Sequence, residues 1–302
     1  MAITIGIDLG GTNIKAALVN PAGHYIYPVM EQTEIEQGYG FLMTQLRGII
    51  KALTSLSPEP PSGVGIGVAG LMDKHSRRII ASPNLGLLKG KHIPKELSEL
   101  SGIPVLMDND VNCTALGEGI VGVAKGKKHY IAITLGTGVG GAIVSDGSFV
   151  RGYQGGGGEI GHVQIHHTGP ICGCGSNGCL ESYIGAQAVL DYVSRNFQRL
   201  DGYDLTEINK LASAGDGDAI EVFTYIAKML AVGLASMVNV FNPQLIVLGG
   251  GISKAGDLVI VPLLAEIKKR AFKPYTRSLK IKTAKLGDWG GVVGAGVLAF
   301  DK

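Results

Sequence analysis

The chain has 302 residues, of which 45% are hydrophobic and 47 are glycine, and its formal net charge is +2. This length allows two domains with buried cores, and the composition is typical of an α/β enzyme with many tight turns and argues against disorder. The near-neutral charge argues against a nucleic-acid partner, and the lack of a signal peptide or of an apolar stretch of roughly 18 residues predicts a cytoplasmic protein without a membrane partner.

The first thirty residues predict a β-meander. Residues 2–9 form an Ile-rich buried strand, and residues 14–20 and 24–30 are expected to form two more strands after glycine-containing turns. Asp8 ends the first strand, and Thr12 lies in the turn that follows. Such a turn can direct backbone amides at phosphate oxygens, while the carboxylate holds a magnesium-bound water. The turn is not a Walker A motif, and an ordinary tight hairpin explains the same residues equally well.

The residues that follow predict a helix, a strand and a hairpin. Helical spacing covers 36–56, and the strand 63–70 carries glycines in the GxGxxG spacing of dinucleotide-binding proteins. A second strand at 79–82 follows instead of a helix, so we reject that interpretation. The glycines of 136–141 fail the same test. In the loop after the hairpin, Asn84 could offer its side-chain amide to a ligand.

Three polar residues follow the predicted strand 103–107: Asp108, Asn109 and Asp110. Helical spacing then resumes. The junction of a strand with a helix is where ligands usually bind in α/β sheets. A carboxylate in this position is either a helix N-cap or a general base, and the residues alone leave both roles open for Asp110.

Residues 130–150 repeat the plan of the first meander, with Leu9-Gly10 and Leu135-Gly136 placed 126 positions apart. The duplication predicts two similar domains that face each other across a cleft and could grip a triphosphate from both sides. This arrangement resembles the actin-like (ribonuclease H-like) ATPase and sugar-kinase superfamily. The expected domains are a small one over 1–109 and a large one over 110–289, with a helix over 290–302 packing back on the first.

The segment 159–181 holds three of the four cysteines in a glycine-rich loop, together with one histidine. Three thiolates and one imidazole form a common structural zinc set, so we predict a closed, tetrahedral Zn²⁺ site that does not activate water. The predicted ligands are His162, Cys172, Cys174 and Cys179. Reduced free thiols, or a Cys172–Cys179 disulfide beside a spare cysteine, are the alternatives.

Two glutamates flank these ligands, and their carboxylates suit a polyhydroxylated molecule such as a sugar. Glu159 lies three positions before His162, and Glu181 lies two positions after Cys179. A histidine that binds metal through one ring nitrogen can offer the other nitrogen to a ligand. We therefore expect Glu159 and Glu181 to bind substrate, with the metal fixing their directions, although each could be a solvated loop residue.

The last third of the chain predicts helices over 185–196 and 217–241 and a buried strand over 245–248. Gly249, Gly250 and Gly251 follow this strand and would let a nucleotide base or ribose approach the backbone closely. Residues 279–284 predict another strand. The chain closes with a helix of small residues.

Together these motifs resemble the ROK family of repressors, open-reading-frame proteins and sugar kinases. The resemblance runs from about Ile5 to Phe300 and rests on DLGGTN, DNDVN, GGGGEIGH, CGCGSNGCLE and the late LGGG. It implies an ATP-dependent sugar kinase with two actin-like domains, magnesium, structural zinc and usually a homodimer.

The resemblance also implies roles for individual residues. Asp110 matches the catalytic base. Sugar contacts are implied for Asn84, Asn109, Glu159, His162 and Glu181. Phosphate, magnesium or nucleotide contacts are implied for Asp8, Gly11, Thr12, Thr137, Gly138, Gly250 and Gly251, and we add their neighbours Gly10, Asn13 and Lys15.

The sequence departs from the family pattern in two places. Gly157-Gly158 replaces the usual Ala-Gly before Glu159, which should be tolerated. Trp289, the only tryptophan, stands where the family has a small or amide residue. It could pack on the adenine or fill space at the boundary between the two domains.

We expect the 6-hydroxyl of a hexose, glucose first, to be the acceptor. N-acetylmannosamine, fructose, mannose and allose are the other candidate sugars. A sugar-responsive transcription regulator is the alternative from another class, but a strand expected from residue 2 leaves no room for its DNA-binding module. A sugar-binding pseudokinase is a third reading, against which the intact Asp110 and DLGGT argue.

Overall fold

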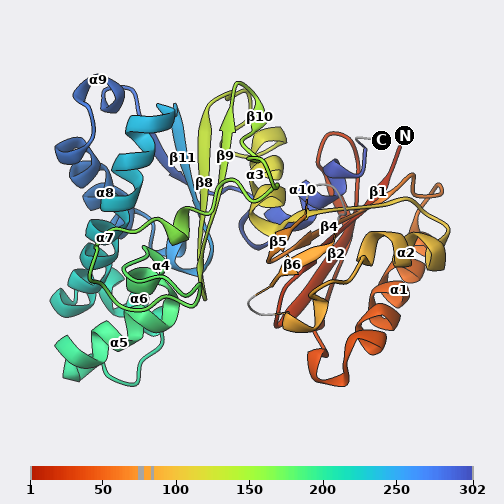
Figure 1. Cartoon of the computed structure of the whole chain (residues 1–302), viewed down its shortest axis with the longest axis horizontal. Helices are drawn as coiled ribbons and strands as arrows, with labels where there is room; N and C mark the ends of the chain where they lie inside the picture. Colours follow the sequence, from red (N-terminus) through yellow and green to blue (C-terminus); the bar gives the residue numbers. More distant parts are fainter. Residues whose placement is uncertain (1, 74–77, 83–84, 301–302) are drawn as a thin grey trace. The chain divides into compact units, whose positions relative to one another are not determined.

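The computed structural model describes residues 2–73, 78–82 and 85–300. The chain folds into two compact units (Figure 1). Unit 1 comprises Met1–Gly126, Arg151–Gly157 and Lys285–Lys302, and unit 2 comprises Lys127–Val150 and Gly158–Ala284. The chain therefore passes between the units four times.

The sheet of unit 1 has five strands in the order β3-β2-β1-β4-β7. The predicted meander forms its antiparallel half, and β4 and β7 add to β1 in parallel. The strands are β1 (Thr4–Leu9), β2 (Asn13–Val19), β3 (Tyr25–Gln32), β4 (Val64–Val68) and β7 (Val105–Asn109). A two-stranded hairpin, β5 (Leu71–Met72) and β6 (Ile79–Ala81), lies in the same unit as predicted.

The two faces of this sheet follow from the alternation of side chains along β1. Ile5 and Ile7 belong to one hydrophobic core with the apolar side of α1 (Tyr39–Leu56) and α2 (Ile93–Ser101). Thr4 and Gly6 point to the opposite face, where α10 (Gly290–Leu298) lies across β1 and β4. In Figure 1 this blue C-terminal helix lies beside the red first strand.

Small residues allow α10 to approach the sheet closely. A Cβ atom added at Gly6 would lie 2.0 Å from the Val292 carbonyl oxygen, and one at Gly65 would lie 1.7 Å from that of Ala295. Both contacts are with backbone, which cannot move aside cheaply. Glycines in two strands are therefore the condition for this helix–sheet contact.

The sheet of unit 2 repeats the topology of unit 1, in the order β10-β9-β8-β11-β12. Again an antiparallel meander is followed by two parallel strands, so the predicted duplication is present. The strands are β8 (Tyr130–Leu135), β9 (Val139–Ser145), β10 (Ser148–Phe149), β11 (Leu245–Gly249) and β12 (Lys280–Thr283).

Unit 2 is covered by helices that the sequence predicted only in part. The predicted helices are present as α5 (Ala186–Asn196) and α7 (Gly217–Phe241), while α6 (Leu205–Ser213) and α8 (Asp257–Arg270) went unrecognised. Two single-turn helices, α4 (Glu181–Ile184) and α9 (Lys273–Thr276), complete the unit. By length and composition α7 could cross a membrane, but half of its most apolar window is buried, as expected of a core helix.

Within residues 2–73, 78–82 and 85–300, six short 3-10 turns connect these elements. They are η1 (Ile35–Gln37), η2 (Gly86–Leu88), η3 (Ile160–His162), η4 (Gln198–Leu200), η5 (Gly251–Ala255) and η6 (Gly287–Trp289). Of these, η3 carries a predicted metal ligand and η5 begins at a residue of the predicted nucleotide loop.

The first boundary between the units lies after Gly126 and not after residue 109 as predicted. Helix α3 (Asp110–Ile120) belongs to unit 1 because it packs on α10 and β4. A Cβ atom at Gly294 of α10 would lie 1.6 Å from the Cys113 carbonyl oxygen, so the two helix backbones nearly touch. No local sequence pattern indicates this contact, since its partners are far apart along the chain.

Candidate active site and metal centre

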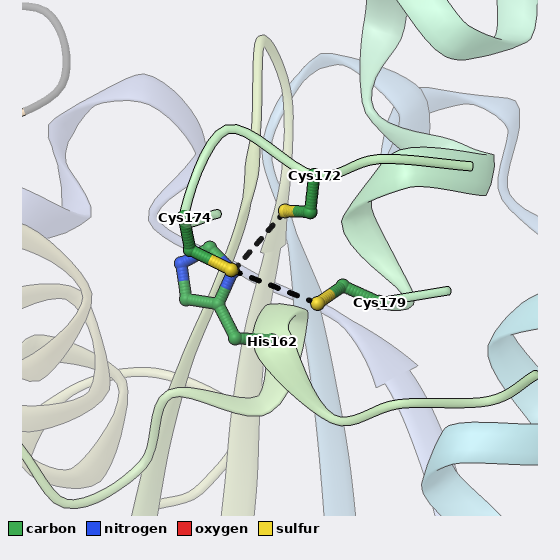
Figure 2. Close-up of side chains that lie close together, drawn as sticks. All are labelled: His162, Cys172, Cys174 and Cys179. Atoms are coloured by element: carbon green, nitrogen blue, oxygen red, sulfur yellow. Dashed lines mark hydrogen bonds between the residues drawn. The ribbon is translucent and has the colours of Figure 1, made fainter. Parts of the chain in front are cut away.

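The four predicted metal ligands converge in unit 2. One ligand atom from each of His162, Cys172, Cys174 and Cys179 lies within 4.8 Å of all the others, and Figure 2 shows these side chains grouped between η3 and the loop that follows. Sγ of Cys174 and Sγ of Cys179 are 3.7 Å apart. Zinc with Zn–S bonds of about 2.3 Å holds neighbouring sulfurs about 3.8 Å apart. This donor set and spacing fit tetrahedral Zn²⁺.

The alternative disulfide is not formed, because all four cysteines of the chain are free. Burial raises the pKa of the Cys172 thiol to about 12. Without a nearby cation this thiol would keep its proton at neutral pH. Coordination of a divalent ion requires the thiolate, so metal binding at this cluster would release protons.

Backbone hydrogen bonds and glycines shape the segment 159–181, which carries the four predicted ligands and is called the metal loop below. Short bridges pair Gln164 with Cys179 and Ile171 with Asn177. Gly178 has a φ of +68°, and a Cβ atom there would lie 1.7 Å from the His166 carbonyl oxygen. Only glycine fits this crossing of two chain segments.

Both flanking glutamates lie beside the metal cluster. Oε2 of Glu181 accepts a hydrogen bond of 2.8 Å from the Val139 amide, and its Oε1 lies 3.7 Å from Sγ of Cys172. Oε2 of Glu159 lies 4.0 Å from Nε2 of His162. Burial, and to a lesser extent the charge of Glu181, raises the pKa of Glu159, which His162 opposes. The direction of Glu181 is thus fixed by strand β9 as well as by the cluster.

The predicted phosphate turn of unit 2 contacts the same glutamate. Thr137 and Gly138 form the turn between β8 and β9, and a Cβ atom at Gly138 would lie 2.5 Å from Oε2 of Glu181. Gly250, with a φ of +81°, follows the neighbouring strand β11 and packs against the carbonyl of Leu135. The phosphate turn and the glycine loop therefore lie at the ends of adjacent strands, where ligands bind in α/β sheets.

Unit 1 carries the other group of predicted residues, at the end of β1. Asp8 is opposite Lys15 in the register of β1 and β2, and Nζ of Lys15 donates to the Asp288 carbonyl at 3.1 Å. Burial and the charge of Asp110 raise the pKa of Asp8 to about 7, while Lys15 opposes the shift. A Cβ atom at Gly291 would lie 2.9 Å from the Asp8 carboxyl carbon, so the start of α10 lies against this acid.

The turn that follows Asp8 is held by three hydrogen bonds. The Gly10 amide donates to the Asn13 carbonyl at 3.1 Å, closing the turn. The Thr33 amide donates to the Thr12 carbonyl, and the Thr33 hydroxyl donates to the Gly10 carbonyl. The backbone of the turn is therefore fixed while the side chains of Thr12 and Asn13 stay exposed.

Asn109, and not Asp110, is the N-cap of α3. Oδ1 of Asn109 accepts from the amides of Val111 and Asn112, and its Nδ2 donates to the Gly70 carbonyl at 3.2 Å. Asp110 is the first residue of the helix. The sequence left two roles open for Asp110, helix cap and general base. Asn109 is the cap, so the role of general base is the one that stays open for Asp110.

A salt bridge between a buried aspartate and a partly exposed arginine lies directly before this cap, and the sequence did not reveal it. Asp108 is 6% exposed and receives two hydrogen bonds from the guanidinium of Arg151, at 2.5 and 3.1 Å. It also accepts from the Asn109 amide at 2.7 Å and from Nδ2 of Asn112 at 2.9 Å. Asp108 could be read as a turn residue, and Arg151 lies outside every motif, so no local signal joined them.

The family model for the ROK family matches residues 4–302. The chain belongs to the ROK family. A glucokinase from Halalkalibacterium halodurans is 33% identical over 310 residues, which cover 97% of this chain and 94% of the relative. A crystal structure of a ROK family glucokinase from Streptomyces griseus in complex with glucose and AMPPNP has a TM-score of 0.88 and 29% identity, and the match covers 100% of both chains. These matches confirm the predicted family and its actin-like sugar-kinase fold.

The ROK family also includes regulators among the relatives of this chain. A xylose repressor from Caldicellulosiruptor bescii is 30% identical over 306 residues, which cover 96% of this chain and 76% of the repressor. Family membership alone therefore does not decide between enzyme and regulator.

In this ROK chain the predicted residues form two groups, one in each unit. Unit 1 holds Asp8, Gly10, Gly11, Thr12, Asn13, Lys15, Asn109 and Asp110. Unit 2 holds Thr137, Gly138, Glu159, His162, Cys172, Cys174, Cys179, Glu181, Gly250 and Gly251. Asn84 lies outside the described residues.

The unusual Trp289 packs within unit 1. Its ring stacks on that of Tyr25, with centroids 5.3 Å apart and an interplanar angle of 17°. The glycines of the predicted adenosine loop belong to unit 2. The contact that the structure describes for Trp289 is therefore structural packing against a tyrosine.

Proposed function

We propose that this ROK protein is an ATP-dependent hexose kinase that phosphorylates the 6-hydroxyl of glucose. The observation that carries the proposal is the pairing of Glu159 and Glu181 with a fitting Cys₃His metal site. Two carboxylates beside an imidazole suit a ligand that presents several hydroxyl groups. The full-length similarity to glucokinases supports glucose as the first sugar to test.

In this proposal Asp110 is the general base. It would take the proton of the sugar hydroxyl as the oxygen attacks the γ-phosphorus of ATP, and such proton transfer typically contributes ~10²–10⁴-fold to a rate. Asn109 is expected to contact the sugar with the second hydrogen of its amide while its oxygen caps α3. Asn84, Glu159, Glu181 and His162 are the further proposed sugar contacts.

The phosphate groups of ATP would lie on the two glycine turns, with Thr12 and Thr137 adding hydroxyl groups. Asp8 is the residue that would hold Mg²⁺, which neutralises charge on the phosphates when bound. Gly10, Gly11, Asn13, Lys15 and Gly138 complete the proposed phosphate contacts, and Gly250 and Gly251 the adenosine contacts. Phosphoryl transfer asks the protein mainly for positioning and charge stabilisation, which these groups supply.

Zinc in the Cys₃His site has a structural role in this proposal. Four protein ligands leave no open position, so the ion would hold His162 and the adjoining loop in place. The free thiols require a reducing compartment, which supports a cytoplasmic location. A homodimer is the proposed assembly, from the family resemblance.

The decisive experiment is ADP release with Mg-ATP and a panel of glucose, mannose, fructose, allose, N-acetylglucosamine and N-acetylmannosamine. We expect glucose to give the highest kcat/KM. Preferred turnover of N-acetylmannosamine or another hexose would overturn the assignment of glucose but keep the kinase.

A sugar-responsive regulator is the second candidate, favoured by the similarity to a xylose repressor. It predicts no turnover of any sugar, together with a sugar-dependent rise in thermal midpoint that does not require ATP. The same panel with thermal shifts therefore distinguishes the two.

A further inference from the structure

We propose that Arg151 is a positioning residue for phosphoryl transfer: through Asp108 it holds the strand-to-helix corner that carries Asn109 and Asp110. The proposal rests on the proposed kinase function, since it assigns Asp110 the role of base. Its physical basis, a charge-paired corner in unit 1, is independent of that function.

The hydrogen bonds of Asp108 join the start of α3 to Arg151. Its carboxylate accepts from the Asn109 amide, from the side chain of Asn112 one turn into α3, and from both terminal nitrogens of Arg151. A guanidinium that donates two parallel bonds fixes the carboxylate in orientation as well as position. Because Asp108 and Asp110 are separated by one residue, turning the Asp108 carboxylate would disturb the backbone from which the Asp110 side chain extends.

Arg151 itself is anchored by the loop that it begins. The segment 151–157 belongs to unit 1 although the chain on both sides of it belongs to unit 2. The Gly157 amide donates to the Arg151 carbonyl at 2.8 Å, which closes the loop. Gly156 packs against Leu71, since a Cβ atom there would lie 2.2 Å from Cδ1 of that side chain. Glu159 follows two residues after this loop, so one short segment links the corner of the base to a proposed sugar ligand.

Arg151 also offsets negative charge at the corner. Burial is the largest cause of the raised pKa of the Cys113 thiol. The negative charges of Asp108, Asp8 and Asp110 raise this pKa further, and the positive charge of Arg151 lowers it. The three acids come from β7, β1 and α3, and Lys15 on β2 is the cation that acts on Asp8. Loss of Arg151 would leave the buried Asp108 charge unpaired beside two other carboxylates.

The test compares Arg151→Ala, Arg151→Lys, Asp108→Asn and the double variant Arg151→Ala/Asp108→Asn with the wild type. Arg151→Ala is expected to lower kcat by ~10–100-fold, because small misplacements of a catalytic group have effects of this size. It should also move the acidic limb of the pH profile of kcat/KM to higher pH, by ~0.5 unit or more. The reason is that the unpaired negative charge of Asp108 favours protonation of the nearby Asp110. Asp108→Asn should move the same limb to lower pH.

The other variants separate charge from geometry. Arg151→Lys keeps the charge but loses the paired bonds, so the limb should stay near that of the wild type while kcat recovers only in part. The double variant removes both charges and should return the limb toward its wild-type position. A merely structural role for Arg151 predicts no opposite shifts in Arg151→Ala and Asp108→Asn. The matched control is Arg199→Ala, which removes the Arg199–Asp216 pair of unit 2 and should leave kcat unchanged.

A second readout does not depend on turnover. The carboxyl carbon of ¹³C-labelled Asp110, assigned with Asp110→Asn, reports the field at the corner through its titration midpoint. Arg151→Ala should raise this midpoint and Asp108→Asn should lower it. If the wild type phosphorylates no sugar but the midpoint moves as stated, the proposed function fails and the charge pairing stands. Unchanged midpoints, or unchanged kcat and limb in Arg151→Ala, would overturn the proposal.

Discussion

At the scale of single residues, Asp110 occupies the first position of α3 while Asn109 supplies the cap. Asp110→Asn keeps the size of the side chain but cannot accept a proton, so we expect kcat to fall by ~10²–10⁴-fold with little change in the thermal midpoint. Steady-state kinetics with the preferred sugar, beside a melting curve, tests this. Turnover within a few-fold of wild type would remove Asp110 from the role of base.

Asp8 gives a pH prediction with a definite sign. Burial raises its pKa from 3.8 to about 7, so the folded protein binds a proton that the unfolded chain releases near pH 4. The stability from this group is complete below about pH 4 and is lost as the pH rises toward 7. In urea unfolding at pH 5 and pH 8, without magnesium or nucleotide, Asp8→Asn should lose less stability than wild type over this range. The exposed Asp201→Asn should behave as wild type, and an identical pH dependence in Asp8→Asn would contradict the prediction.

The sequence singled out Asp8 and Asp110 as candidate site residues. Asp8 was predicted because a carboxylate before a Gly/Thr turn is chemically distinctive. The role of Asp110 stayed open because Asn109 and Asp110 both suit a helix start, and only the backbone decides which one caps. Arg151 was missed because its partner Asp108 is 43 positions away, and a long-range ion pair leaves no local pattern.

At the scale of elements, helix α10 depends on glycine at its contact with α3. Gly294→Ala should destabilise the protein by ~1–3 kcal/mol or more, because the added methyl group would meet the Cys113 backbone. Gly48→Ala in α1 is the matched control, since a Cβ atom added there would have nothing within 4 Å. That exposed change should stabilise by ~0.5–1 kcal/mol. Urea unfolding of both variants tests the pair, and equal effects would disprove the packing argument.

The metal loop provides the second prediction for an element. Purified protein should contain one zinc ion per chain, and Cys174→Ser should lower this content and raise the KM for sugar, because Glu159 and Glu181 adjoin the cluster. Elemental analysis and kinetics measure both effects. Cys113→Ala removes a cysteine outside the cluster and should keep the zinc. Full zinc occupancy in Cys174→Ser would show that Cys174 is not a ligand.

Most elements with local signatures were predicted, although α6 was missed despite the capping box that Asp204 and Glu207 form at its start, and contacts between distant segments were not predicted. The two meanders were visible because strand, glycine turn and strand recur within a few residues. Helices α6 and α8 went unrecognised, and α8 has a proline, Pro262, inside it. The assignment of α3 to unit 1 depends on α10, which is formed by the end of the chain.

At the scale of the whole molecule, unit 1 is built from three separate parts of the chain. Removing residues 285–302 deletes α10 and exposes one face of β1 and β4. Hydrogen exchange should then become fast at the amides of β1 and β4, while β8 and β11 in unit 2 remain protected. The full-length protein is the reference. Continued protection of β1 and β4 after the deletion would show that the sheet does not need the helix.

The position of α10 also has a consequence for synthesis in the cell. The ribosome makes β1 before α10, so the face of the unit 1 sheet that α10 covers stays open until residues 290–298 have been synthesised. Unit 2, whose residues end at Ala284, has all of its strands and helices before that point. Folding during translation therefore favours the second unit over the first, which reverses the usual order from N-terminus to C-terminus.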